Sequence, residues 1–365
     1  MLHQYNRRIY KNKKGYIKLK NRETKKEKYS YDIGLAILRP ILAFFVIMTH
    51  HYKFDEAKGK WKEIIINANY FNFHVPIFFI MSFYFSYNTL ISSNYKKKFE
   101  RLQRLFIPYF FYPIFVFFLN KLLLKYSITK NEIKLKHLKH QLLYGTGYIV
   151  VFWYQLDLIF ITICFILIIF IFRKYCNLIF IIIAITAFIY QYNGKNRLFF
   201  SKYYDGRQHT FGKFLEIIPY TVTGFLISYS SIINYLKKHR LKTIIICIYI
   251  IYFISNYKVF NYVKGFDYNG VNLFLKSICI FFSFAMFPSE KIKNKIIIKI
   301  IKQIISYTPG IIFLHIEVIA YISYYITSIK KIKVISCVIV YLICYLICLV
   351  GSLIFGKTKL RHLFE

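Results

Sequence analysis

Long apolar stretches, separated by short basic segments, constrain the fold of this chain more than any other feature of its sequence. Each stretch is roughly 18 to 25 residues long, which as a helix crosses the hydrocarbon core of a bilayer. Inside that core every backbone polar group must be paired within its own segment, and this favours helices. Strands of a membrane barrel are about half as long and alternate in polarity, which these stretches do not. The sequence therefore predicts an all-α, polytopic membrane helical bundle.

Composition supports this class. Hydrophobic residues make up 57% of the 365 positions, and the mean hydropathy of +0.43 is too high for an ordinary soluble domain. We predict about ten transmembrane helices. Their approximate ranges are 32–50, 64–91, 105–124, 148–172, 177–192, 214–234, 241–256, 271–289, 306–328 and 334–355.

The formal charge of +37 would suggest nucleic-acid binding in a soluble protein. Here the basic residues lie mainly between the apolar stretches, where Lys and Arg set membrane orientation and contact anionic lipid. No nucleic-acid partner is expected. Eleven Lys or Arg in the first 30 residues indicate that the N-terminus is cytosolic. The predicted organisation is a basic cytosolic tail (1–31), a transmembrane domain (32–356) and a short cytosolic C-terminal tail (357–365). A plasma or inner membrane is favoured over an internal eukaryotic one.

Two polar segments are candidates for helices at the membrane surface. Residues 121–141 carry six lysines on the side predicted to be outside, and they could form an interfacial helix. Alternatively, the third predicted span is wrong. Residues 291–305 alternate lysines and isoleucines at helical spacing, which is typical of an amphipathic helix on the cytosolic surface. The seven cysteines form no C-x-x-C pair, so neither a zinc site nor a disulfide framework is indicated, and no metal is expected.

Ionisable residues inside a membrane span are costly and mark candidate functional sites. Arg39 and His50 lie eleven residues apart in the first span. On a helix this spacing puts both on one face, separated by about 16 Å along the axis. An arginine near one end and a histidine near the other suit a cavity that receives a long anionic ligand. In the alternative interpretation, Arg39 extends to the interface and His50 only ends the helix.

Other polar residues have both a functional and a structural interpretation. His74 could be catalytic or simply interfacial. Arg101 and Arg104 could bind phosphate or anchor the orientation of the chain. His315 and Glu317 could bind substrate or make polar contacts between helices. The last two are two residues apart, so they point in different directions on a helix.

Six short segments occur in an order that resembles one known family. They are Leu38-Arg39-Pro40 with Met48-Thr49-His50, the run from Phe73 to Ser82, the run from Arg101 to Tyr109, the run from Phe152 to Leu156, the run from Ile218 to Gly224, and the run from Tyr307 to His315. The first resembles an Arg-x10-His signature, and the second an F-H-M-P-L-F-F-x-x-S-G run. Together they resemble the acyltransferase 3 family of membrane-embedded O-acyltransferases, in a minimal, fucose 4-O-acetylase-like form without an appended esterase domain. Phe83, where the family has Gly, and Pro309 depart from the pattern and leave open divergent specificity or lost activity.

The resemblance implies transfer of an acyl group, usually acetyl from acetyl-CoA, to a sugar hydroxyl of a glycan or glycolipid. It implies that His50 is the general base or a transient acyl carrier, with Arg39 and His74 also catalytic. Arg39, Arg101 and Arg104 would bind the donor. The residues expected to bind the acceptor are His74, Trp153, His315 and Glu317.

A transporter or flippase for glycans or lipids is the alternative function, since ten spans with buried charges suit it as well. The Arg-x10-His pair and the F-H-x-P run favour the transferase. The expected partners are membrane lipid, an acyl-CoA donor and a glycan or glycolipid acceptor. The oligomeric state is not predicted.

Overall fold

The computed structural model describes residues 32–51, 73–126, 132–145, 152–192, 211–257, 271–288, 292, 294–325, 333–356 and 363. Within these ranges all regular secondary structure is helical, which confirms the predicted all-α bundle. The basic tail, residues 1–31, lies outside them.

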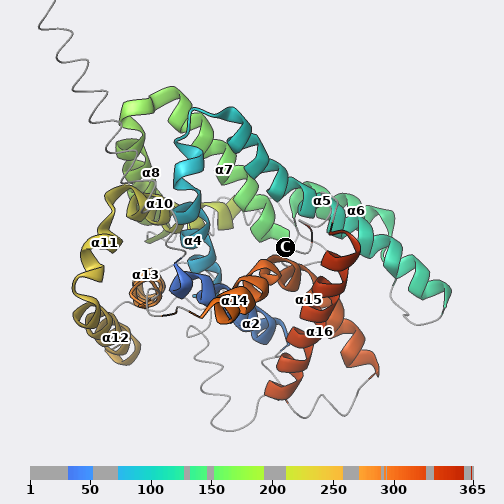
Figure 1. Cartoon of the computed structure of the whole chain (residues 1–365). Helices are drawn as coiled ribbons and strands as arrows, with labels where there is room; N and C mark the ends of the chain where they lie inside the picture. Colours follow the sequence, from blue (N-terminus) through green and yellow to red (C-terminus); the bar gives the residue numbers. More distant parts are fainter. Residues whose placement is uncertain are drawn as a thin grey trace, which may run out of the picture.

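The helices form a bundle in which segments distant in sequence lie side by side (Figure 1). In chain order they are α2 (Ile33–His51), α4 (His74–Leu90), α5 (Tyr95–Lys125), α6 (Leu135–Tyr144), α7 (Phe152–Phe172), η3 (Arg173–Tyr175), α8 (Cys176–Tyr192), α10 (Phe211–Ser230), α11 (Ile232–Lys237), α12 (Arg240–Tyr257), α13 (Val271–Ala285), α14 (Lys295–Ser306), α15 (Thr308–Tyr325) and α16 (Lys333–Ile354).

Each of the ten predicted spans overlaps at least one of these helices. Four helical stretches among the described residues are long and apolar enough to cross a membrane: Ile33–His50, Tyr95–Lys125, Phe152–Ile189 and Ser336–Ile354. The helices α14 and α15 meet at a 40° bend and would together make a fifth crossing. The number of ten crossings therefore stays a prediction. The 38-residue stretch is interrupted by η3, where Arg173 has a φ of 34°, so it comprises the two helices α7 and α8.

The helix α2 occupies the centre of one half of the bundle and packs against α4, α13, α14, α15 and α16. Its approach to α13 is close, because a side chain at Gly34 would collide with the backbone of Phe284. Leu35, Leu38 and Leu42 of α2 are fully buried. This packing holds Arg39 and His50, on one helix, against several neighbours.

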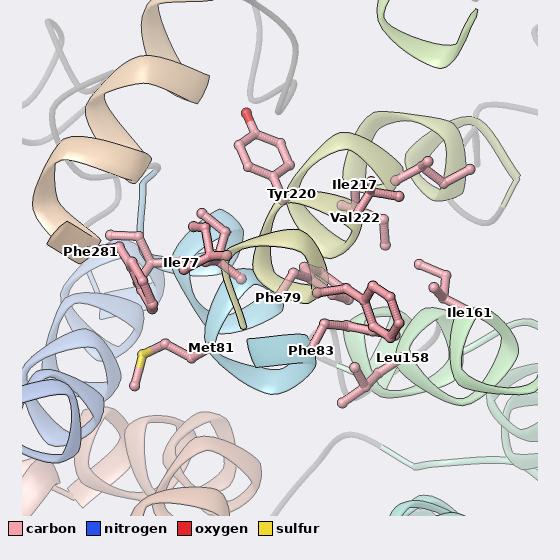
Figure 2. Packing of buried hydrophobic residues seen from close by; sticks show 14 of the residues in the cluster. Ile77, Phe79, Met81, Phe83, Leu158, Ile161, Ile217, Tyr220, Val222 and Phe281 are labelled. Atoms are coloured by element: carbon pink, nitrogen blue, oxygen red, sulfur yellow. The ribbon is translucent and has the colours of Figure 1, made fainter. Parts of the chain in front are cut away.

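The helix α4 packs against α10 at backbone distance. A Cβ added at Gly224 of α10 would lie 2.8 Å from the carbonyl carbon of Ile80. Figure 2 shows the apolar cluster at this place, with side chains of α4 in the middle and those of α7, α10 and α13 around them. Phe83 is fully buried here, with its ring centre 4.5 Å from that of Phe165. A large side chain therefore fills the position at which the sequence departs from the family pattern.

A second apolar cluster joins α5, α7, α15 and α16. Tyr112 of α5 lies in it, against the rings of Phe152 and Phe313. The Tyr112 hydroxyl donates a hydrogen bond to the carbonyl of Leu363, which is itself buried. Leu363 thus lies inside the bundle. Leu363 belongs to the predicted C-terminal tail, 357–365. The other residues of that tail lie outside the described ranges.

Both polar segments contain a helix. The helix α6 lies within residues 132–145 and ends at Gly145, whose φ of 66° is readily adopted by glycine. The helix α14 begins after Asn294, whose side chain accepts hydrogen bonds from the amides of Ile296 and Ile297. Its position at the membrane surface stays a prediction.

Candidate active site

Three histidines from three helices come together in the bundle. The rings of His50 on α2 and His315 on α15 have centres 5.2 Å apart, at an interplanar angle of 45°. His74, the first residue of α4, is close enough to interact electrostatically with His315. His50 is exposed, whereas His74 and His315 are buried. A substrate can therefore reach this cluster from the side of His50.

The hydrogen bond of His315 determines which of its nitrogens can act as a base. Its Nδ1 lies 2.6 Å from the carbonyl oxygen of Ile312. Because a carbonyl oxygen can only accept, Nδ1 carries the proton and Nε2 of the neutral ring keeps its lone pair. That Nε2 is buried and makes no hydrogen bond within the described part of the chain. His315 thus presents an unused acceptor beside His50.

A cavity of about 420 Å³ lies among α2, α4, α5, α7, α14 and α15. Three cationic side chains line it, Arg39 from α2, Arg104 from α5 and Lys302 from α14. Among the described residues that line it there is no Asp or Glu. Arg104 and Lys302 are exposed and Arg39 is half-buried, so the cations extend inward from an open mouth. An anionic ligand is the electrostatic complement of such a cavity.

Aromatic side chains hold the cationic wall in place. The guanidinium of Arg39 lies 4.7 Å from the ring centre of Phe85 on α4, a cation–π distance. Tyr154 of α7 lines the cavity and interacts electrostatically with both Arg39 and Arg101. Its ring packs 4.7 Å from that of Phe79. Tyr154 is therefore supported from the core and lies near both arginines.

Arg101 lies outside the cavity lining, unlike Arg104, and contacts the wall from behind. Its Nη2 donates a hydrogen bond to Ser82 Oγ at 3.2 Å, and its guanidinium lies 5.6 Å from the ring centre of Phe83. Arg101 does not appear among the residues that line the cavity, but its partner Ser82 does. Arg101 thus positions α4 against α5 and orients a hydroxyl of the cavity wall.

The cavity and the histidine cluster are joined through two helices. Arg39 and His50 belong to the same face of α2, about 16 Å apart along its axis. On α15, Ile312 lines the cavity and its carbonyl holds the ring of His315, one turn further on. Among the described residues no histidine lines the cavity itself, so α2 connects the cation-lined cavity, at Arg39, with the histidine cluster, at His50 near the end of the helix.

The structure brings together five of the eight residues singled out from the sequence. His50, His74 and His315 form the cluster, while Arg39 and Arg104 line the cavity. Arg101 lies behind the wall, as described above. Trp153 is buried in the core and does not appear in the lining. The side chain of Glu317 lies outside what the structure describes. These positions leave the assigned roles as predictions.

Sequence reasoning missed several polar residues of the cavity, among them Tyr154, Gln155 and Lys302. Gln155 donates a hydrogen bond to the carbonyl of Leu105 at 2.8 Å, which links α7 to α5. Tyr154 and Gln155 directly follow Trp153, and Lys302 belongs to the amphipathic lysine pattern. Their polar side chains, within or beside an apolar span, were the sequence feature that could have identified them.

Pro309 has a structural explanation. It is the second residue of α15, and the first turn of a helix tolerates proline because its amide has no partner within the helix. Pro309 lines the cavity beside Thr308. The helix α15 therefore begins at the cavity wall.

No curated protein and no solved structure matches this chain. A family model described as an acyltransferase domain matches residues 32–357, nearly the whole chain. The match includes every helix described above. The chain therefore belongs to the acyltransferase 3 family and is a membrane acyltransferase.

Proposed function

We propose that this protein transfers an acetyl group from acetyl-CoA to a sugar hydroxyl of a glycan or glycolipid. Family membership establishes acyl transfer, and the donor and acceptor are what we add. One observation carries the proposal: a cation-lined cavity and a pair of histidines are connected by the same helix, α2. A donor with phosphates at one end and a thioester at the other suits this separation.

The donor end of the proposal rests on charge. Arg39, Arg104 and Lys302 come from three helices and surround one cavity, which suits a ligand with more than one negative charge. Ser82 and Thr308 add hydroxyl groups to the same wall. With a cytosolic N-terminus, as we propose, the mouth would lie on the cytosolic side, where acyl-CoA is available.

The chemistry at the histidines needs one proton acceptor. The acceptor hydroxyl loses its proton to an imidazole nitrogen as its oxygen attacks the thioester carbonyl carbon. The carbon–sulfur bond then breaks, the thiolate takes up the proton, and an ester and free coenzyme A result. His50 is the proposed base, because it is exposed to an incoming acceptor and lies beside the unused Nε2 of His315. A transient acyl group on His50 is the alternative route.

The acceptor class rests on the family resemblance. The exposure of His50 is compatible with a bulky acceptor, such as a glycan carried on a lipid. A plasma or inner membrane is the proposed location, and membrane lipid surrounds the bundle.

The test is acyl transfer from radiolabelled acetyl-CoA into glycans and lipids of membranes that contain the protein. The parent is compared with His50→Ala at matched expression. His239→Ala serves as the control, because His239 is exposed and lies between α11 and α12, outside the cavity and the histidine cluster. We expect label with the parent and with His239→Ala, and at least about a hundredfold less with His50→Ala.

Other outcomes would separate the parts of the proposal. Label that persists in His50→Ala keeps the transferase and removes His50 as an essential base. Absence of label from the parent across several acceptors refutes the acetyl donor. Movement of unmodified glycan across the membrane, without label, would favour the transporter or flippase.

A further inference from the structure

The helix α14 has two opposite faces. Ile296, Ile297 and Ile300 are exposed, whereas Ile305 is buried. At about 100° per residue, Lys302 points away from all three exposed isoleucines. The side that carries Lys302 faces the cavity, since Lys302, Ile305 and Ser306 all line it.

Contacts with the rest of the bundle hold the Lys302 side of α14 against the cavity. The helix packs against α2, which carries Arg39. At its other end the chain bends by 40° and continues as α15. The first residues of α15, Thr308 and Pro309, line the same cavity. Figure 1 shows α14 beside α2 and leading into α15.

Charge at the cavity mouth therefore has contributions from three separate helices. Arg39, Arg104 and Lys302 each come from a different element. Lysine binds phosphate as a point charge and can adjust along its flexible stem. An ammonium at the mouth is thus well suited to a phosphate group that enters from water.

We propose that Lys302 contacts the phosphate-bearing end of the acyl donor, which makes α14 part of the donor site. This rests on the proposed function for the identity of the donor. It assigns to α14 a binding role in addition to any contact with the membrane surface. Lys295, on the same side of α14, does not line the cavity and provides a matched control.

The experiment measures coenzyme A binding and acetyl transfer in nanodiscs of neutral phosphatidylcholine. We expect Lys302→Gln to raise the Kd for coenzyme A and the KM for acetyl-CoA about tenfold, because a charge-assisted contact is lost. Lys302→Arg restores most of the affinity. Lys295→Gln changes either value less than about twofold, since its charge acts only through solvent. With acetyl-pantetheine, which has no phosphate, the difference between parent and Lys302→Gln disappears.

Each contrary result has its own meaning. A parent that binds no coenzyme A refutes the donor in the proposed function, whatever Lys302 does. If the parent and Lys302→Gln bind coenzyme A equally tightly, the proposed contact of Lys302 is overturned. An equal loss in Lys302→Gln and Lys295→Gln shows general attraction and also overturns it. If Lys302→Gln alters only the binding of added phosphatidylglycerol, the phosphate belongs to a lipid headgroup and the donor contact is refuted.

Discussion

Substitution of Gly224 by alanine tests the close contact between α10 and α4, the second of which lines the cavity. The added Cβ would lie 2.8 Å from the carbonyl carbon and 2.9 Å from the Cα of Ile80. The carbonyl oxygen of Ile80 would be closer still. Ordinary contacts begin at 3.4 Å, so α10 and α4 must separate by at least about 0.6 Å. The colliding atoms are backbone, and no side-chain rotation can relieve them.

The expected loss of stability follows from two opposing effects. Overpacking of this kind costs typically about 1–3 kcal/mol. Alanine also favours a helix over glycine by about 1 kcal/mol, but the collision with backbone places the packing cost at or above the top of its range. We expect a net loss of about 2 kcal/mol and a fall in Tm of about 3–6 °C.

The assay is thermal unfolding in detergent, followed with a maleimide dye that fluoresces on reaction with thiols. Six of the seven cysteines are buried and become reactive as the bundle opens. Ser230→Ala, at the exposed end of the same helix, is the control and should melt within about 1 °C of the parent. Gly224→Val should melt lower than Gly224→Ala, because it adds two further methyl groups. If Gly224→Ala and Gly224→Val both melt like the parent, the close approach of α4 and α10 is refuted.

Two further predictions concern the site itself. Tyr154→Phe should raise the KM for acetyl-CoA about threefold to tenfold, because a hydroxyl of the cavity wall near both arginines is lost. Trp153→Phe should change this KM less than about twofold, because Trp153 is buried and does not line the cavity. Equal effects of the two substitutions on the KM would contradict the placement of Tyr154 in the cavity wall. His315→Gln should lower kcat by about 10²–10⁴-fold with the KM for the donor nearly unchanged, if Nε2 assists the proton transfer. A lower Tm with an unchanged kcat would show that His315 is only structural.

The positions of the helices were largely predictable from the sequence. A long apolar run in a bilayer must pair its own backbone, so ten such runs indicate ten helices, whatever their contacts. The spacing of Arg39 and His50 likewise required only the geometry of one helix. The alternating lysines of residues 291–305 predicted α14 for the same reason, since they report a local periodicity. The predicted second span began at residue 64, whereas α4 begins at His74, and residues 64–72 lie outside the described ranges.

Contacts between helices were decided by the tertiary structure alone. His50 and His315 are 265 residues apart, and nothing in either span determines that α2 and α15 pack together. The same holds for Lys302, which reaches the cavity only because the chain bends at Tyr307 and lays α14 against α2. Which of the neighbouring residues Trp153 and Tyr154 lines the cavity was also decided by the packing. The two side chains point to different sides of α7, and only Tyr154 lines the cavity. In an apolar bundle every face of a helix is a possible packing surface, so periodicity shows little about which neighbour each face meets. The sequence thus determined the helices and the polar residues on them, and the packing of helices distant in the chain decided which of those residues share a site.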